Sequence, residues 1–350
     1  MKHITLSPIT KRRLSRFCKT KRALVSLIIL GSLYFISLFS EFIANDKPIL
    51  IRYEGKYYFF AAFRFYSDET FGGKYKTEAE YKKIAKSEYF RANKKNFMWF
   101  PIVPYSPYNS NLAELDGFPP TAPDRHHIMG TDDRGRDVFV RLLYGFRVSM
   151  TFALILLIPE ILLGVAIGGI QGYIGEMFDI TLQRIIEILS SLPFLYIVIL
   201  IGNIFGKSLG TLILILGMCN WIGLSYYIRA EFLRIKQFQF VQAARSMGMS
   251  PFKILFSEIL PNALTPIVTF MPFSLIGNIS SLSSLDYLGF GLPAPTPSWG
   301  ELIKQGTEYL TSYWLSVYPF VALFLTLLLT AFVGEGIREA VDPKDFSLLE

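Results

Sequence analysis

Residues 23–43 read ALVSLIILGSLYFISLFSEFI, an apolar run interrupted by a charge only at Glu41. About 20 apolar residues in a helix cross the ~30 Å hydrocarbon core of a membrane, because each residue adds about 1.5 Å. The run therefore predicts a first transmembrane helix over residues 23–43. Five further runs of the same character lie at residues 148–170, 192–205 (after a polar lead-in), 209–228, 264–288 and 313–334.

The composition points to the same class of protein. Of the 350 residues, 51% are hydrophobic and 18% are charged, whereas a soluble domain carries ~25% charged residues. This balance all but excludes a soluble cytoplasmic enzyme, and the continuous runs disfavour a β-barrel, whose strands alternate. The predicted fold class is an all-α integral membrane protein with about six transmembrane helices, whose core occupies residues 148–334.

One face of the second run is lined by glycine. Gly164, Gly168 and Gly172 recur every four residues. Small residues at this spacing let the backbones of two membrane helices approach closely. The pattern therefore predicts tight packing of the second transmembrane helix on a neighbour.

The distribution of charge predicts the orientation. Residues 1–22 hold eight Lys or Arg and no acid, and such a basic tail stays cytoplasmic under the positive-inside rule. A cleavable signal peptide is the alternative, but the apolar stretch is long enough to span and no clean A-x-A site follows it. Residues 44–130 are then extracytoplasmic, an insertion between the first two helices. The loop at 238–262 and the tail at 335–350 are cytoplasmic.

The insertion at residues 44–130 is rich in aromatic residues and proline and shows no lasting period. We expect it to be a docking surface for an external protein or ligand, and not for nucleic acid. His126 and His127 are expected to be exposed, since no further ligands stand at a spacing that would complete a metal site. Residues 131–147 read as an interfacial amphipathic helix that Asp133 can cap.

The cytoplasmic segment Phe238–Asn262 (FQFVQAARSMGMSPFKILFSEILPN) reads as helix, stop, helix. Gly248 suits the position just after a helix, where the backbone adopts a positive φ. Ser250 suits an N-cap and Pro251 the first helical turn. Pro261 is expected to stop the second helix.

The first of these two helices carries the small residues Ala243 and Ala244 after Gln242, so we expect a partner protein to approach this face closely. The spacing also fits a DNA-binding helix-turn-helix, but a loop tethered between two membrane helices cannot enter a major groove. Gly206-Lys207-Ser208 resembles the end of a phosphate-binding P-loop, yet the motif's first glycine is missing. The sequence thus predicts no nucleotide site in this chain.

Two carboxylates, Glu160 and Asp286, fall inside predicted transmembrane helices. Ionisable residues in the membrane are costly and are candidates for a substrate path; a paired structural carboxylate is the alternative for each. No catalytic residue set is evident, because a nucleophile with a base at suitable spacing is missing. A secondary, ion-gradient-driven transporter is the alternative from another class, although no inverted repeat supports it.

The cytoplasmic segment resembles the EAA loop of the permeases of binding-protein-dependent ABC importers, whose consensus is EAA-x3-G-x9-I-x-L-P. Gln242 replaces the glutamate, and Glu258 stands at the isoleucine position. The matching residues are Ala243, Ala244, Gly248, Leu260 and Pro261.

Further segments narrow the resemblance to the oligopeptide/dipeptide C-type permeases. The GTDxxGRD segment before the second helix of that group is matched by Gly130, Thr131, Asp132, Gly135, Arg136 and Asp137. Residues 288–291 and 297–302 resemble the connection between the last two helices. The long insertion, together with residues 40–48 (SEFIANDKP) and Arg52-Tyr53-x-Gly55, is similar to that of the Yej-type permeases, which import peptides and the peptide-nucleotide antibiotic microcin C.

The resemblance implies a type I ABC importer permease fold in the bacterial cytoplasmic (inner) membrane, surrounded by lipid. It implies four kinds of partner: a second permease, two cytoplasmic ATPases that hold ATP and Mg²⁺, an extracytoplasmic binding protein, and a peptide as cargo. This chain itself is expected to bind no cofactor and no metal. Its loop at 238–262 is expected to couple it to an ATPase through Gln242, Ala243, Ala244, Gly248, Leu260 and Pro261.

Overall fold

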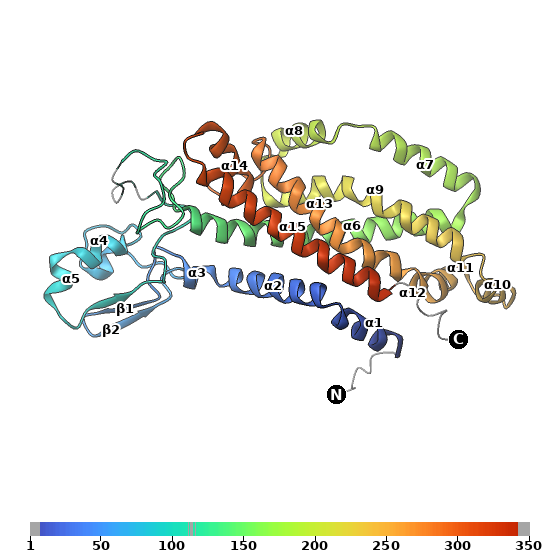
Figure 1. Cartoon of the computed structure of the whole chain (residues 1–350), viewed down its shortest axis with the longest axis horizontal. Coiled ribbons are helices and arrows are strands. Elements are labelled where there is room, and N and C mark those ends of the chain that lie inside the picture. The colour runs from blue at the N-terminus through green and yellow to red at the C-terminus, as the bar shows by residue number, and fades with distance from the viewer. Residues whose placement is uncertain (1–7, 111, 113–114, 116, 342–350) are drawn as a thin grey trace. The chain divides into compact units, whose positions relative to one another are not determined.

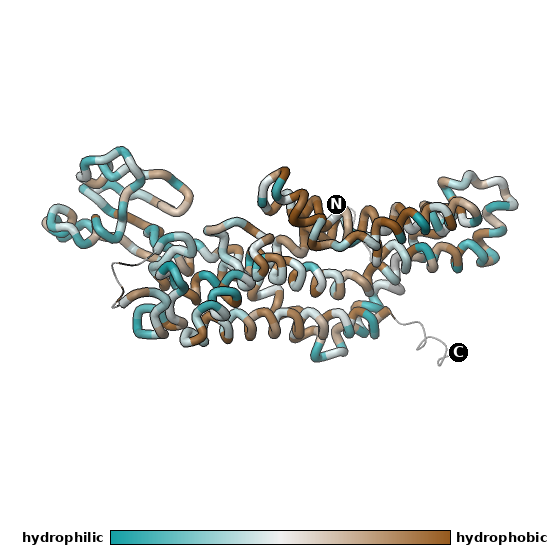
Figure 2. Tube along the Cα trace, turned by 90° about the horizontal axis from the view of Figure 1, so that it is seen from above, coloured by the Kyte–Doolittle hydropathy of each residue, from teal (hydrophilic) through white to brown (hydrophobic). Residues whose placement is uncertain are grey.

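The computed structural model describes residues 8–110, 112, 115 and 117–341 (Figure 1). The chain divides into two compact units, which are described separately. The first comprises residues 1–32, 149–293 and 323–350, and the second comprises residues 33–148 and 294–322. Helices dominate, and Figure 2 shows that their tubes carry long hydrophobic stretches.

The long helices of the first unit include those that the apolar runs predict, together with one in the basic tail and one in the polar lead-in of the third run. They are α1 (Pro8–Lys19), α2 (Lys21–Leu38), α6 (Val138–Ile174), α7 (Glu176–Ser190), α8 (Phe194–Phe205), α9 (Leu209–Ile235), α13 (Leu264–Tyr287) and α15 (Trp314–Val341), of which α2, α6 and α15 extend into the second unit. Among the described residues, five helices are long and apolar enough to cross a membrane, namely α2, α6, α9, α13 and α15.

A sixth candidate span is bent. Helices α7 and α8 pass the same test together, with an angle of 74° between them. The break falls before Pro193, whose ring disfavours helical backbone at the preceding residue, and Pro193 precedes α8 in an extended conformation. The count of about six transmembrane helices is thereby confirmed, and the polar lead-in of the third run is the separate helix α7.

Helix α6 differs from the prediction of an interfacial helix over 131–147 followed by a span from 148. The structure has one continuous helix that begins at Val138. Asp137 caps it, since its Oδ1 accepts the N–H of Val140 at 2.9 Å. Asp133 therefore does not cap this helix, and the residues from Thr131 to Asp137 form a turn closed by a β-bridge.

The glycine face of α6 packs on α9, as its spacing predicts. A methyl group added at Gly168 would lie 2.4 Å from the carbonyl oxygen of Ser225, and one at Gly172 would lie 2.6 Å from that of Arg229. Arg229 also bonds Asp179 of α7 through two nitrogens, at 2.5 and 2.6 Å. Backbone contact and a bidentate ion pair thus hold α9 between α6 and α7.

The second unit contains a small lobe, for which residues 44–130 are long enough, although its strands and helices were not predicted. Its elements are α3 (Ser40–Ile43), β1 (Leu50–Tyr53), β2 (Lys56–Phe59), a 3₁₀ turn (Asp68–Phe71), α4 (Tyr81–Lys86), α5 (Glu88–Ala92) and β3 (Phe97–Trp99), and α14 (Trp299–Glu308) also belongs to this unit. The strands pair antiparallel in the order β2-β1-β3. Ile51, Phe71, Tyr81, Ile84 and Phe90 form the core of the lobe. The mostly helical fold therefore includes a three-stranded sheet within residues 44–130, where an all-α class had been expected.

We expect Gly168→Ala to destabilise the protein, because its new methyl group would press on the backbone of α9. Overpacking of this kind costs about 1–3 kcal/mol. The matched control is Gly277→Ala on α13, where an added Cβ has no neighbour within 4 Å. The melting temperature of the purified protein in detergent should fall for the first variant and stay or rise slightly for the second. Equal melting temperatures would contradict the packing described.

Candidate functional site

The segment after α9 folds as a compact helix pair. Helix α10 (Gln239–Ser246) ends two residues before Gly248, whose φ is +75°, and the N–H of Met249 returns to the carbonyl oxygen of Ala244 at 3.1 Å. Ser250 then caps the next helix by accepting the N–H of Lys253 at 3.4 Å. The predicted stop and cap of this segment are confirmed.

The second helix does not end where expected. After α11 (Pro251–Lys253) the backbone makes a π-helical turn over Ile254–Ile259 and continues as α12 (Leu260–Asn262). The expectation that Pro261 stops the helix was therefore wrong. Pro261 lies within this run of helical backbone, which ends one residue later at Asn262.

One side of this helix pair belongs to the interior of the first unit. Val241, Ala244, Ile254 and Ile259 are buried in one cluster, together with residues of α9 and α13. The α9 and α13 members are Leu224, Ile228, Phe232, Ile235 and Ile267. The expectation that Ala244 faces a partner was therefore wrong, because its side chain points into the protein's own core.

The neighbouring residues of the predicted set lie differently. Ala243 is exposed. Gln242 is exposed too, and its Nε2 donates to the carbonyl oxygen of Lys236, just beyond the end of α9, at 2.9 Å. Gln242 and Ala243 thus lie at the surface, whereas Ala244 lies in the core.

A hydrophobic surface accompanies Ala243 on the exposed side. Met247 is 75% exposed and Phe252 is 73% exposed, and the ring of Phe252 lies 4.5 Å from that of Phe256. These residues were missed by sequence reasoning. A signal was present, because Met247 follows Ala243 by four residues and so shares its face of the helix. Ala243, Met247 and Phe252 are named the coupling surface below.

The segment before α6 forms a buried ion cluster in the second unit. Asp132 Oδ1 accepts the backbone N–H groups of Arg134 and Arg136 at 3.0 and 2.9 Å. Its Oδ2 accepts Arg136 Nε at 2.6 Å, and both side chains are almost fully buried. Burial, together with the adjacent Asp132 carboxylate, raises the pKa of Asp133.

The two arginines of this cluster reach α14. Arg136 Nη2 lies 3.4 Å from Glu301 Oε1, and Arg141 Nη2 donates to Glu301 Oε2. Arg141 also donates to the carbonyl oxygen of Pro107 at 3.1 Å. The cluster therefore joins the start of α6 to α14.

The remaining residues of the predicted segment shape the turn around this cluster. Gly130 and Gly135 have φ of +75° and +73°, and the Thr131 carbonyl accepts Trp314 Nε1 at 3.1 Å. His127, which we expected to be exposed, is buried, and its Nδ1 lies 2.8 Å from Asp137 Oδ2. Asp137 thus holds His127 and caps α6 with the same carboxylate.

The two intramembrane carboxylates have separate sets of partners. Glu160 accepts hydrogen bonds from Ser274 Oγ at 2.7 Å and Asn278 Nδ2 at 3.1 Å, and Asn278 in turn accepts Asn220 Nδ2 at 3.0 Å. This network joins α6, α13 and α9. Asp286 Oδ1 accepts the N–H of Leu292 at 2.7 Å and so holds the turn after α13.

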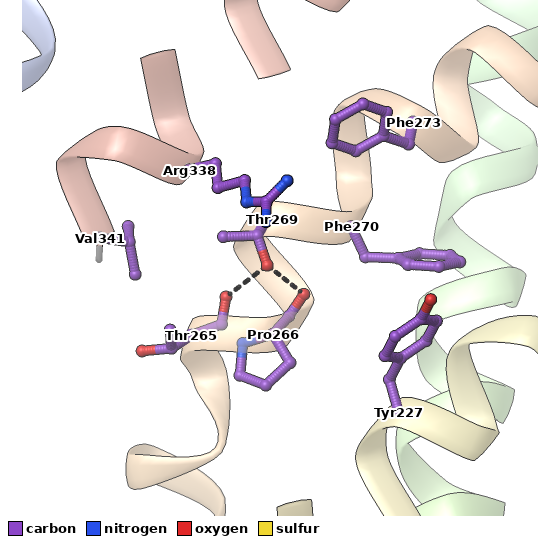
Figure 3. Close-up of a pocket in the computed structure, with 8 residues that line it drawn as sticks. All are labelled: Tyr227, Thr265, Pro266, Thr269, Phe270, Phe273, Arg338 and Val341. Carbon is purple, nitrogen blue, oxygen red and sulfur yellow. Dashed lines mark hydrogen bonds between the residues drawn. The ribbon is translucent and has the colours of Figure 1, made fainter. Parts of the chain in front are cut away.

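A cavity of about 400 Å³ opens between α9, α13 and α15 (Figure 3). Its lining residues are Tyr227, Thr265, Pro266, Thr269, Phe270, Phe273, Arg338 and Val341. Aromatic rings and one guanidinium thus surround the same space, and the rings of Tyr227 and Phe270 lie 5.4 Å apart. Neither Glu160 nor Asp286 lines it.

The sequence matches a known family across this region. Residues 161–345, which include the helix pair, match the profile of the binding-protein-dependent transport system inner membrane components. The chain belongs to this family. Residues 9–56 match the N-terminal TM domain of oligopeptide transport permease C. The resemblance drawn from the EAA-like loop and the GTDxxGRD segment is thereby confirmed.

Relatives agree over nearly the whole chain. The peptidoglycan transport system permease protein YejE of Agrobacterium fabrum strain C58 is 39% identical, with 97% of this chain and 94% of the relative covered. The inner membrane ABC transporter permease protein YejE of Escherichia coli strain K12 is also 39% identical, with coverage of 97% and 98%. The dipeptide transport system permease protein DppC of Bacillus subtilis strain 168 is 36% identical, with coverage of 69% and 75%.

We expect Glu301→Gln to lower stability, because it leaves the buried guanidinium groups of Arg136 and Arg141 with less compensating charge. Loss of one partner of a buried charge network costs on the order of 2 kcal/mol when that partner is itself partly exposed. Glu308→Gln on the same helix is the control, since its pair with Lys304 is exposed and 3.9 Å apart. The melting temperature should fall only for Glu301→Gln.

The two adjacent alanines of α10 should respond differently to the same substitution. Ala244→Trp places an indole in the buried cluster and should cost about 3 kcal/mol or more, which will appear as a lower melting temperature. Ala243→Trp adds the indole to the exposed side and should leave the melting temperature unchanged. A destabilised Ala243→Trp protein would contradict the orientation of α10.

Proposed function

We propose that this chain is the membrane-spanning permease subunit of an ATP-driven importer of peptides, and that the segment at 238–262 couples it to cytoplasmic ATPases. The observation that carries the proposal is the two-sided character of the helix pair. The coupling surface is apolar and exposed, whereas the opposite side is part of the membrane unit's core. An exposed apolar patch of this kind marks a protein interaction site.

The packing supports a lever mechanism. Val241 and Ile254 pack in the same cluster as Phe232 of α9 and Ile267 of α13. Because a close-packed interior deforms little, a partner that moves the coupling surface also moves the ends of α9 and α13. We propose that ATP binding by the partner ATPases moves this segment as a unit and switches access to the translocation path.

Nucleotide binding is assigned to the partners, which would hold ATP with Mg²⁺. Lys207, the lysine of the P-loop-like Gly206-Lys207-Ser208, donates to the carbonyl oxygen of Gly289 at 2.7 Å. It is therefore engaged within the fold. The proposed assembly also includes a second permease and an extracytoplasmic binding protein, as the family's description of binding-protein-dependent transport suggests.

We propose peptides, including peptide conjugates, as the cargo, because the similar permeases are described as peptidoglycan and dipeptide transport proteins. The cavity of Figure 3 offers what a peptide's termini and side chains require, namely a guanidinium from Arg338 and aromatic faces. Glu160 remains our candidate for a residue of the path, since its hydrogen-bond network joins three spanning helices. Asp286 also remains a candidate, in addition to its bond to Leu292.

We propose that both termini and the helix pair lie in the cytoplasm of a bacterial cell and that residues 44–130 lie outside. Helix α1 carries much of the basic tail, and Thr20 at its end donates to Glu339 of α15 at 3.1 Å. Arg13 of α1 lies 3.5 Å from Thr265 at the start of α13, directly after α12. These contacts support the proposal that the N-terminal helix, the end of α15 and the helix pair lie on one side of the membrane.

The family assignment favours this reading over an ion-gradient-driven transporter. The two differ in their energy source. Uptake into vesicles that contain the complete complex should require ATP inside and should persist when ion gradients are collapsed. Uptake that follows an ion gradient without ATP would favour the secondary transporter.

Ala243→Trp should block peptide uptake although the protein stays folded, because the indole occupies the coupling surface. We expect uptake by cells that depend on this chain to fall at least about tenfold, equivalent to ~1.4 kcal/mol of lost coupling. Ala230→Trp is the control, since Ala230 is an exposed alanine of α9 outside the helix pair. Both proteins should reach the membrane at normal levels. Normal uptake by Ala243→Trp would refute the docking role of this surface.

A further inference from the structure

The outer face of the small sheet is aromatic. In the register of the strands, Ile51 stands between Tyr58 and Met98, and these three side chains pack toward the core of the lobe. The alternation of strands sends the next residues to the opposite face. On that face Leu50 stands between Phe59 and Trp99.

A second row on the same face repeats the arrangement, with Arg52 between Tyr57 and Phe97. The Arg52 guanidinium lies 5.3 Å from the centre of the Tyr57 ring. Trp99 is 63% exposed and Phe59 is 50% exposed. An antiparallel sheet with one solvated face normally presents polar residues there. The aromatic composition of this face therefore indicates contact with something less polar than water.

The aromatic surface continues beyond the sheet toward α2. Phe60 and Phe63, both exposed, lie 5.8 and 5.9 Å from the ring of Phe42 in α3. Phe42 in turn lies 6.4 Å from Phe39, which lies 5.1 Å from Phe35 on α2. A chain of ring contacts thus leads from a membrane-spanning helix to the start of the lobe's outer face.

The end of this surface near α2 is the more apolar one. Phe59 and Phe60, at the end of β2, are 50% and 45% exposed. Arg64 follows Phe63 at this end, whereas Glu54, Lys56, Lys94 and Lys95 gather at the far end of the strands. Aromatic side chains followed by lysines form the gradient that proteins present to the boundary between acyl chains and headgroups.

We propose that the outer face of the sheet, with Phe59, Phe60, Phe63 and Trp99, rests in the interfacial layer of the leaflet in which α2 ends. The ligand of this surface is the lipid itself, through its acyl and glycerol region. The ring contacts with Phe42 place the surface within one short helix of the end of α2. Lipid contact fixes the tilt of the lobe relative to the membrane.

The test measures the environment of single nitroxide labels on the full-length chain in phosphatidylcholine vesicles. In a Cys18→Ser, Cys219→Ser background, labels are attached at Phe59→Cys and, in a separate protein, at Trp99→Cys. Lys94→Cys is the control, since Lys94 is exposed at the charged end of the lobe. Each label is probed by collision with oxygen, which concentrates in lipid, and with a water-soluble nickel complex.

The proposal expects an oxygen-to-nickel collision ratio several-fold higher at positions 59 and 99 than at position 94. Equal ratios at the three positions would overturn it. It would also be overturned if the labels at 59 and 99 were open to nickel in the permease alone and became shielded only when an extracytoplasmic binding protein was added, because the surface would then serve a protein partner. The measurement needs no transport, so its result is independent of the proposed import activity.

Discussion

The packing of Val241, Ala244 and Ile254 against α9 and α13 is the constraint on which the candidate site depends. Without it, the residues between the two spanning helices would form a flexible loop. Movement of a partner bound to that loop would then not be transmitted to the spanning helices. With it, Met247 and Phe252 are presented on a support that is continuous with the membrane unit. The same alanine pair that gives the segment its family resemblance thus has one member facing outward and one anchoring the support.

Local chemistry was sufficient to predict some features from the sequence. The spanning helices follow from apolar runs that need no partner to be recognised. The end of α10 just before Gly248 and the cap at Ser250 follow from backbone preferences of single residues. The close approach of α6 and α9 follows from the spacing of Gly168 and Gly172. In each case the deciding interaction lies within a few residues or on one helix face.

Other features depend on residues that are distant in the sequence and were missed for that reason. Ala243 and Ala244 are chemically identical, and only the positions of Leu224 and Ile228 on α9 decide which one is buried. Asp133 and Asp137 can both cap a helix; the turn around Asp132 and the buried His127 select Asp137. The strands of the lobe are only three or four residues long, too short for a period of two to stand out, and β1 pairs with β3 across more than forty residues of chain.

The side chain at position 242 affects how the helix pair is held to the end of α9. The family consensus has glutamate there, and an ionised carboxylate can only accept hydrogen bonds. Gln242 instead donates an amide proton to the Lys236 carbonyl, a bond that a carboxylate could not make. Gln242 therefore holds α10 to the end of α9 through a hydrogen bond from a neutral side chain. This bond does not depend on an ionic attraction that dissolved salt would weaken.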